Sequence, residues 1–306
     1  EFPYTTSIER GIEEVRAEGM IKLFDSHCHL QDARILSQAP QVIATALASG
    51  VLRFAVNGVS ENDWHLVNQL SDSYPCVIPC FGLHPWYVME RSPLWFSTLK
   101  DFFQSNPSAA VGEIGLDKGS RGREIDFDDQ VEVFQQQLAL AKELNRPASI
   151  HCVRAYGNLL AVLQRMGPFP AGVVLHSYLG SAEIVPELDK LGAYFSFSGF
   201  LMSMKAQKAK KMLKRIPTNK ILLETDAPDA LPKGCSEREE ASQNLCSATD
   251  LVALADQKLN HPANIHEVLN YMASLLEMSK EELAEISYGN AVRVFSYGRS
   301  KVRAED

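Results

Sequence analysis

The sequence has few of the features that mark membrane, secreted or disulfide-rich proteins. No apolar run approaches the roughly 18–20 residues needed to cross a bilayer. Residues 1–16 lack the basic-then-apolar pattern of a secretory signal peptide. The six cysteines form no CxxC pair of the zinc-binding kind, and free thiols in a long chain are typical of a reducing compartment. We therefore expect no membrane partner and a cytoplasmic location, with the nucleus or an organelle as alternatives.

Several signatures of enzymes and binding proteins are also missing. The sequence has no glycine-rich phosphate loop, no serine nucleophile elbow and no cysteine protease signature, and we expect no organic cofactor. The net charge of −8 argues against a broad nucleic-acid surface, because phosphate binding usually needs a basic footprint. A deep site escapes this argument, since bound cations would reverse the local potential. The lysine-rich segment 204–215 is interpreted as a solvated helix face.

Short β-branched or aromatic runs alternate with longer helical patterns along the whole chain, and no linker or internal repeat interrupts them. Such alternation predicts parallel strands with right-handed crossovers, and eight units close most naturally into a barrel. The predicted fold is α/β, a single-domain (β/α)8 TIM-type barrel over residues 21–300 with extra C-terminal helices. Residues 1–20 are expected to form an N-terminal arm or extra helix. The predicted strands are residues 21–29, 52–59, 77–83, 109–116, 148–151, 173–176, 194–198 and 221–225.

Helical patterns fill the intervals between these strands. Ser181 is expected to cap the helix after strand six, Gly192 to follow its last turn, and Ser279 to cap the final helix. The long polar segment 229–260 is expected to be a loop and helix beside the barrel mouth. The predicted helices include residues 41–49, 62–71, 127–144, 157–165, 182–191, 204–215, 265–278 and 280–295.

Six side chains that can bind metal stand at the ends of five predicted strands. The carboxyl ends of all strands meet at one face of a barrel, so these side chains should converge there. Imidazole and carboxylate together suit Mg²⁺, Mn²⁺ or Zn²⁺. An HxH pair alone is a weak signal, but its convergence with four further ligands favours a metal site over surface histidines. The six are His27, His29, Glu113, His151, His176 and Asp226.

The alternation of side chains along a strand gives these residues neighbours on the same face. His27 and His29 should both point into the mouth, with Ser26 and Cys28 facing outward. Asp25 and Glu224 should lie beneath the ligands, either as hydrogen-bonded structural groups or as groups that orient the imidazoles. These two possibilities are open at this point. Asp117, just beyond strand four, is expected to serve the loop rather than the metal.

Three further residues at strand ends are also expected at the mouth. His84 ends strand three and is expected to be a seventh ligand, a donor to a substrate anion, or a residue that holds the loop. Trp86 and Tyr178 also fall at strand ends, where they could stack on a base.

Short motifs of this sequence occur together in one known family. They are Asp25-Ser26-His27-Cys28-His29, Gly82-Leu83-His84-Pro85, Gly112-Glu113-Ile114-Gly115-Leu116-Asp117, Ile150-His151, Leu175-His176, Glu224-Thr225-Asp226-Ala227-Pro228, the Gln130, Phe134, Gln137-Leu138 helix and Asn260-His261-Pro262. The set resembles the TatD family of metal-dependent deoxyribonucleases, within the amidohydrolase superfamily, over residues 24–295. The resemblance implies two divalent metal ions.

The resemblance also implies a role for each ligand. His27, His29 and Asp226 would hold one ion, His151 and His176 would hold the other, and Glu113 would bridge them.

The sequence departs from the family pattern near the substrate. Val153 stands where an arginine is usual and Arg154 follows it, Lys118 replaces a common aromatic residue, and Tyr178 replaces a phenylalanine. The segment 229–260 is longer than is typical.

The function that follows is hydrolysis of DNA phosphodiester bonds by a two-metal activated water. Glu113 and Asp226 would be catalytic, with Asp226 as ligand and general base. His84, Arg154 and Lys118 would hold phosphate oxygens and Tyr178 would contact the substrate. A mouth built of loops favours an exonuclease on single-stranded or frayed ends. Mg²⁺ is the first choice of ion, with Mn²⁺ or Zn²⁺ as alternatives.

Two other readings remain. The same barrel could cleave an amide, an ester or an aminoacyl-tRNA bond. A non-catalytic interaction protein would be expected to have lost at least one ligand, and all six are present.

Overall fold

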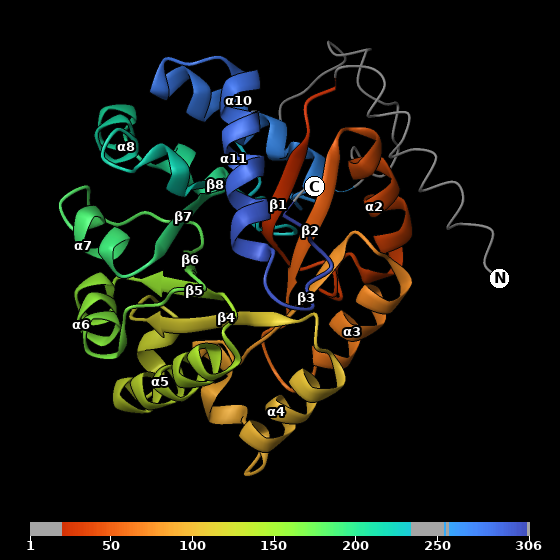
Figure 1. Cartoon of the computed structure of the whole chain (residues 1–306), viewed down its shortest axis with the longest axis vertical. Coiled ribbons are helices and arrows are strands. Elements are labelled where there is room, and N and C mark those ends of the chain that lie inside the picture. The colour runs from red at the N-terminus through yellow and green to blue at the C-terminus, as the bar shows by residue number, and fades with distance from the viewer. Residues whose placement is uncertain (1–19, 234–253, 255–256, 305–306) are drawn as a thin grey trace.

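The computed structural model describes residues 20–233, 254 and 257–304, and it confirms the predicted barrel (Figure 1). Eight parallel strands follow one another around a single sheet in chain order. Their side chains are apolar in near-continuous runs because both faces of a parallel sheet are covered. The strands are β1 (Leu23–Cys28), β2 (Val51–Asn57), β3 (Val77–Phe81), β4 (Ala110–Asp117), β5 (Ala148–Val153), β6 (Val173–Leu175), β7 (Ala193–Phe197) and β8 (Ile221–Leu223).

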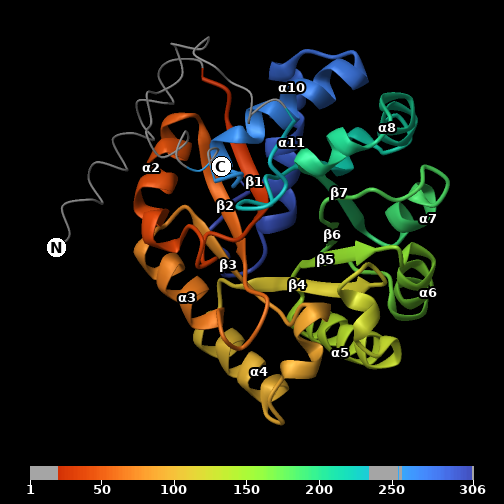
Figure 2. The ribbon, with the colours of Figure 1, turned by 180° about the vertical axis from the view of Figure 1, so that it is seen from behind.

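Helices surround the barrel, as the two opposite views show (Figures 1 and 2). Each predicted helix overlaps an observed one, and α4 was not among those predicted. Within the described residues no helix is both long and apolar enough to cross a membrane. The helices are α2 (Ala39–Ala48), α3 (Trp64–Ser73), α4 (Trp95–Ser105), α5 (Phe127–Leu144), α6 (Tyr156–Met166), α7 (Val185–Lys190), α8 (Ala206–Leu213), α10 (Ile265–Leu276) and α11 (Lys280–Phe295).

The seam between β1 and β8 is joined where the two strands end. The backbone N–H of Asp226 donates to the His27 carbonyl at 2.9 Å, and that of His29 donates to the Ala227 carbonyl at 2.7 Å. These bonds draw the first and last strands together at the barrel mouth. Asp226, which follows the last strand, therefore becomes a neighbour of His27 and His29 at the end of the first.

The opposite end of the barrel is closed by α11. The ring of Phe295 stacks on Phe24, at the start of β1, with centroids 5.1 Å apart. The Asn290 amide donates to the carbonyls of Thr218 and Ile221, near the start of β8. This end is therefore filled by packing, and the mouth remains available for chemistry.

The helix ends show where local signals were sufficient. Ser279 caps α11, since its side chain accepts from the Glu282 N–H. Gly192, at φ +97°, follows the last turn of α7 as expected. Ser181 does not cap α7, which begins at Val185 with Pro186 in its first turn.

Strict alternation also fails at one position of β1. The register against β2 is irregular between Asp25 and Cys28. Ser26, expected to face outward, instead hydrogen-bonds Ser196 on β7 across the barrel interior at 2.7 Å.

Some expectations fall outside the described residues. They are the N-terminal arm, residues 1–19, and most of the segment 229–260.

Candidate metal centre

Side chains from β1, β4 and β5 and from the residues just after β1, β6 and β8 converge at the mouth, and His84, after β3, joins them. All are buried except His29, which is partly exposed. Three overlapping groups have ligand atoms within 4.8 Å of one another. These groups are His27, Glu113 and His176; His27, His29 and Asp226; and His84, Glu113 and His151.

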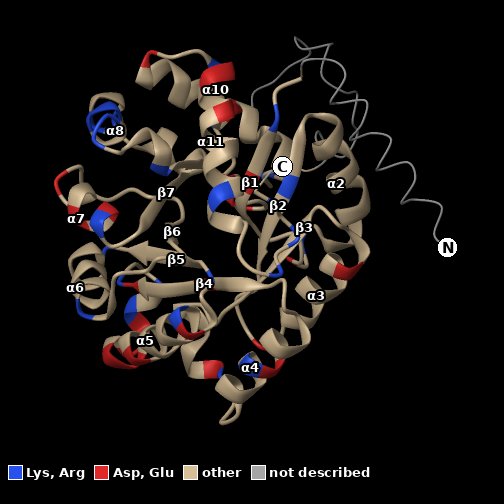
Figure 3. Cartoon of the chain, viewed as in Figure 1, with Lys and Arg blue, Asp and Glu red and all other residues tan. Residues whose placement is uncertain are grey.

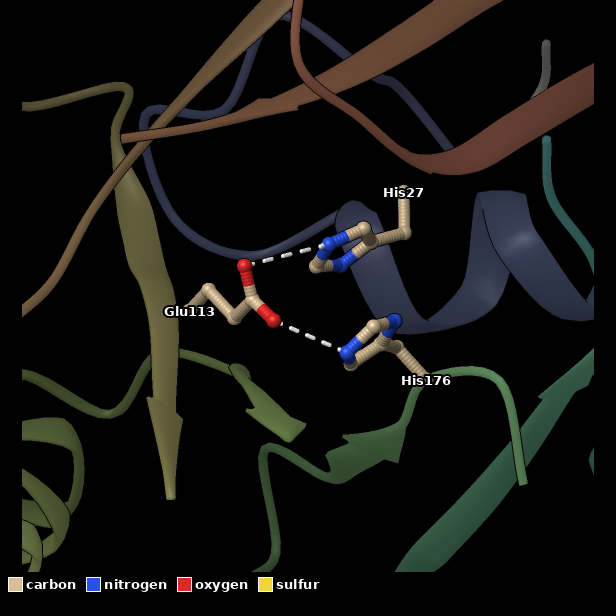
Figure 4. Close-up of side chains that lie close together, drawn as sticks. All are labelled: His27, Glu113 and His176. Carbon is tan, nitrogen blue, oxygen red and sulfur yellow. Dashed lines mark ion pairs between the residues drawn. The ribbon is translucent and has the colours of Figure 1, made fainter. Parts of the chain in front are cut away.

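The carboxylate of Glu113 stands between two sets of imidazoles. Its Oε2 lies 3.6 Å from His27 Nε2 and 3.3 Å from His29 Nε2. Its Oε1 lies 2.9 Å from His176 Nε2 and 3.1 Å from His151 Nδ1. Figure 4 shows the carboxylate between His27 and His176, with one oxygen toward each ring. One carboxylate thus offers an oxygen to each half of the site.

Asp226 completes the half of the site that contains His27 and His29. Its Oδ1 lies 3.7 Å from His27 Nε2 and 3.5 Å from His29 Nε2. In this half, the ligand atoms come from β1, β4 and the end of β8.

The outer nitrogens of three of the imidazoles are engaged by hydrogen-bond partners from the protein. His29 Nδ1 contacts the Asn57 carbonyl at 2.8 Å, and His151 Nε2 contacts Asp117 Oδ2 at 3.0 Å. Both partners are acceptors, so each outer nitrogen carries the proton and the inner nitrogen presents a lone pair. His27 Nδ1 similarly contacts the Ser149 hydroxyl at 2.7 Å. This is the arrangement by which proteins orient metal-binding histidines.

The inner nitrogens have the spacing that a cation requires. His27 Nε2 and His29 Nε2 are 3.2 Å apart, and His151 Nδ1 and His176 Nε2 are 3.3 Å apart. Two ligands about 2.1 Å from one ion are separated by roughly 3.0–3.4 Å at octahedral or tetrahedral angles. The residues present therefore fit divalent ions.

Electrostatics make Glu113 an anion despite its burial. Burial alone would raise the pKa of this carboxyl, but His84, His176 and His151 hold it well below its usual range. Conversely, Glu113 and Glu224 raise the pKa of His176 well above its usual value against the effect of burial. Without cations, His29, His151 and His176 keep a proton to higher pH than a free imidazole, and bound ions would replace those protons.

The two buried carboxylates beneath the ligands have different partners. Asp25 accepts hydrogen bonds from both the backbone and the hydroxyl of Thr225, which ties β1 to the end of β8. Glu224 Oε1 accepts from Ser177 and lies 3.5 Å from His176 Nδ1. The partners of Asp25 are those of a hydrogen-bonded structural group. Glu224 lies behind the His176 imidazole, where it can orient that ring toward the site.

Asp117 has a larger part than the sequence indicated. Its Oδ1 accepts from the Gly119 N–H, as expected for a loop residue. Its Oδ2 also contacts His151 Nε2 and accepts from Trp86 Nε1 at 2.6 Å. Asp117 therefore orients His151 from outside the site, and its shared parity with Glu113 was the only sequence signal for this.

His84 faces the site with one nitrogen and the loop with the other. Its Nδ1 accepts from the Trp86 backbone N–H at 3.1 Å, so its proton resides on Nε2. That Nε2 lies 3.3 Å from Glu113 Oε1. The geometry favours a hydrogen-bond donor that also holds the loop over a further metal ligand.

The centre forms the floor of an open pocket of about 1200 Å³. Arg154 lines this pocket, but Lys118 and Tyr178 do not. The Lys118 ammonium bonds Asn158 and covers the Phe127 ring outside it. Tyr178 is fully buried, with its hydroxyl bonded to the Ser181 carbonyl. Tyr178 is therefore removed from the candidate substrate contacts, and Lys118 does not reach the pocket where a substrate would lie.

Four non-glycine residues of the pocket have left-handed backbone conformations. They lie after β5, β6 and β8 and are Arg154 at φ +53°, Ser177 at +43°, Asp226 at +56° and Ala230 at +53°. Such conformations cost about 1–3 kcal/mol each and cluster at functional sites.

A parallel eight-stranded barrel with buried imidazoles and carboxylates at its mouth has the architecture of a metal-dependent hydrolase. Residues 24–296 match the TatD-related DNase family. The chain belongs to this family.

Curated relatives match over nearly their whole length. The Bacillus subtilis protein YabD, described as an uncharacterized metal-dependent hydrolase, is 30% identical over 273 residues, covering 89% of this chain and 98% of that protein. The 3′-5′ ssDNA/RNA exonuclease TatD of Pantoea vagans is 28% identical, covering 89% and 99%. Human deoxyribonuclease TATDN3 is 28% identical, covering 92% and 97%.

The fold is shared with a solved structure, the TatD homologue YJJV of Escherichia coli. It superposes with a TM-score of 0.77 at 24% identity, covering 91% of this chain and 99% of that one.

Proposed function

We propose that this protein hydrolyses phosphodiester bonds of DNA with two divalent ions, Mg²⁺ first among them. His27, His29 and Asp226 would hold one ion, His151 and His176 the other, and Glu113 would bridge them. The observation that carries this proposal is the Glu113 carboxylate, whose two oxygens face different imidazole sets at 2.9–3.6 Å.

The chemistry divides between the ions and the chain. When bound, a pair of ions would supply an activated water and offset the charge that develops on the phosphate. Asp226, at the wall of the pocket, accepts the proton of the attacking water. His84 donates a hydrogen bond from its Nε2–H to a phosphate oxygen, since its Nδ1 is engaged by the loop. Arg154 provides a guanidinium for a second oxygen of the same phosphate.

The shape of the site supports action on a strand end. The ligands lie on the floor of an open pocket, and a flexible single strand or a frayed end can bring a phosphate to that floor more readily than an intact duplex can. The names of the relatives from Pantoea vagans and human fit this substrate. We therefore propose an exonuclease on single-stranded or frayed DNA.

Labelled oligonucleotides provide the test. Single- and double-stranded DNA carrying a 3′ or 5′ label is incubated with Mg²⁺, Mn²⁺, Zn²⁺ or EDTA. We expect metal-dependent shortening of single strands, at least about a hundredfold slower in Asp226→Asn. A metal-loaded protein that cleaves no DNA but cleaves an amide, an ester or an aminoacyl-tRNA would overturn the proposal.

A further inference from the structure

Arginines supply all the positive side chains, apart from histidine, that line the pocket within the described residues. They are Arg34, Arg121 and Arg154. Arg34 is neutralised by paired contacts with Asp32 and Asp229. The guanidinium of Arg121 has no hydrogen bond or ion pair to any described residue, so its charge remains available to a ligand.

Arg121 rests on an aromatic platform. Its guanidinium carbon lies 4.6 Å from the ring centroid of Trp86 and 5.3 Å from that of Tyr87. A guanidinium on an aromatic face keeps its N–H edge free, and a phosphate is the ligand that this edge matches best. The side chain is exposed while both rings are half-buried, so the platform presents the cation to the pocket.

The loop that carries Arg121 is held in place. The Gln130 amide donates to the carbonyls of Asp117 and Gly122 and accepts from the Asp117 N–H. Gly122 packs so closely on Asp117 that an added Cβ would lie 2.3 Å from the Asp117 carbonyl oxygen. A preorganised cation loses little conformational freedom on binding, which favours affinity.

The position of the platform relates Arg121 to the metal centre. The Trp86 ring contacts both the guanidinium, 4.6 Å from its centroid, and the His151 ring, at a centroid distance of 5.8 Å. Arg121 is therefore linked to the metal centre through one aromatic ring, so a strand bound at the centre can present its next phosphate to the guanidinium. His84, whose Nε2 lies 3.3 Å from Glu113, and Arg154 are the candidates for the phosphate under attack.

We infer that Arg121, on Trp86 and Tyr87, forms a second phosphate subsite that binds the phosphate next to the scissile one. This rests on the proposed function, because it assumes a nucleic-acid strand in the pocket. The subsite makes the enzyme prefer substrates with at least two internucleotide phosphates.

The test uses metal-loaded protein and thymidine oligomers whose linkages contain a bridging methylene and resist cleavage. The dissociation constants of the dimer, with one linkage, and the trimer, with two, are measured by titration calorimetry. Wild type should bind the trimer about tenfold or more tightly than the dimer, because only the trimer gains a charged hydrogen bond to a second phosphate. Arg121→Ala should abolish the difference. Arg123→Ala, an exposed arginine of the same loop that does not line the pocket, should keep it.

Salt dependence identifies what Arg121 binds. The slope of log affinity against log salt is negative, and loss of one phosphate contact should make it less steep for the trimer by about 0.7. An unchanged preference in Arg121→Ala overturns the inference. A lost preference with an unchanged slope also overturns it, because a base rather than a phosphate would then occupy the platform.

Cleavage is measured separately with the oxygen-linked trimer. If the trimer preference depends on Arg121 but metal-loaded wild type cleaves nothing, the proposed function fails and the subsite stands. If wild type cleaves the trimer and Arg121→Ala keeps the same preference for trimer over dimer, only the subsite fails.

Discussion

At the scale of single residues, the centre depends on groups that contact the ligand side chains but would not contact the ions themselves. Asp117 is the clearest case, since one of its oxygens is shared by His151 Nε2 and Trp86 Nε1. The contact fixes the tautomer of His151 and turns its Nδ1 toward Glu113.

Substitution of Asp117 should therefore weaken metal binding. In Asp117→Asn we expect the affinity for Mn²⁺ to fall about 10–100-fold, as is typical when such a partner is removed. Competition with a metallochromic chelator measures it, with Asp101→Asn, an exposed residue of α4, as control. Equal affinities in the two variants would show that His151 needs no such support.

Metal binding should also depend on pH through His29. Although burial lowers the pKa of this imidazole, Asp226 and Glu113 raise it to about 9. Below this pH a bound ion must displace a proton, so apparent metal affinity should rise with pH and level off above about 9. Proton release on addition of Mn²⁺ in weakly buffered solution measures the exchange. Absence of release near neutral pH would contradict it.

Sequence reasoning at this scale succeeded where strand ends dictate position and failed where loops do. The six ligands were predictable because β-strand ends converge in a barrel. Tyr178 was placed at the mouth by the same logic, yet it follows Ser177, whose left-handed backbone sends the chain away from the strand path. Arg121 belongs to a loop with no periodicity, and no local signal indicates that it reaches Trp86.

At the scale of elements, α5 organises two of the loops that carry the site. Gln130 holds the loop after β4, and Gln137 exchanges hydrogen bonds with both the N–H and the carbonyl of Leu83, next to His84. Both glutamines are buried on the barrel side of the helix. The positions of His84 and Arg121 thus depend on one helix.

Removal of the Gln137 amide should affect both stability and catalysis. Gln137→Leu leaves two buried backbone groups without partners, so the free energy of unfolding should fall by about 1–3 kcal/mol. We also expect a lower kcat/KM, because His84 loses its fixed position. Urea unfolding and oligonucleotide cleavage measure the two effects. The neighbouring Gln136→Leu removes only a bond to Glu132 and is the control; an equal loss there would refute the assignment.

Elements were predictable where burial or capping is strong. All eight strands follow from apolar runs buried on both faces, and α5 and α11 have the predicted bounds. The start of α7 was misplaced at Ser181, although Pro186 is the residue that fits a first turn. The basic helix α8, visible in Figure 3, pairs Lys210 and Lys214 with Glu277, as a solvated outer face would.

At the scale of the whole molecule, the metal centre joins the first and last strands of the barrel. His27 lies in β1, His29 directly follows it, and Asp226 follows β8, across the seam where only a few backbone bonds connect the strands. Ions bound there would hold the seam closed.

Metal should therefore stabilise the complete fold. At a concentration 100 times the Kd, binding adds about 2.7 kcal/mol, which for a chain of this size raises Tm by roughly 4 °C. Thermal unfolding with increasing Mn²⁺, and with EDTA as control, measures it. A Tm independent of metal would mean that the seam closes without ions.

The most direct test of the account is the number of ions that the site holds. Mn²⁺ bound at saturation is counted by equilibrium dialysis and elemental analysis in wild type and in Glu113→Gln. The account predicts two ions per chain in wild type, and weaker binding of both in the variant because each loses one carboxylate oxygen. A single ion in wild type, or two ions whose affinities ignore Glu113, would contradict it.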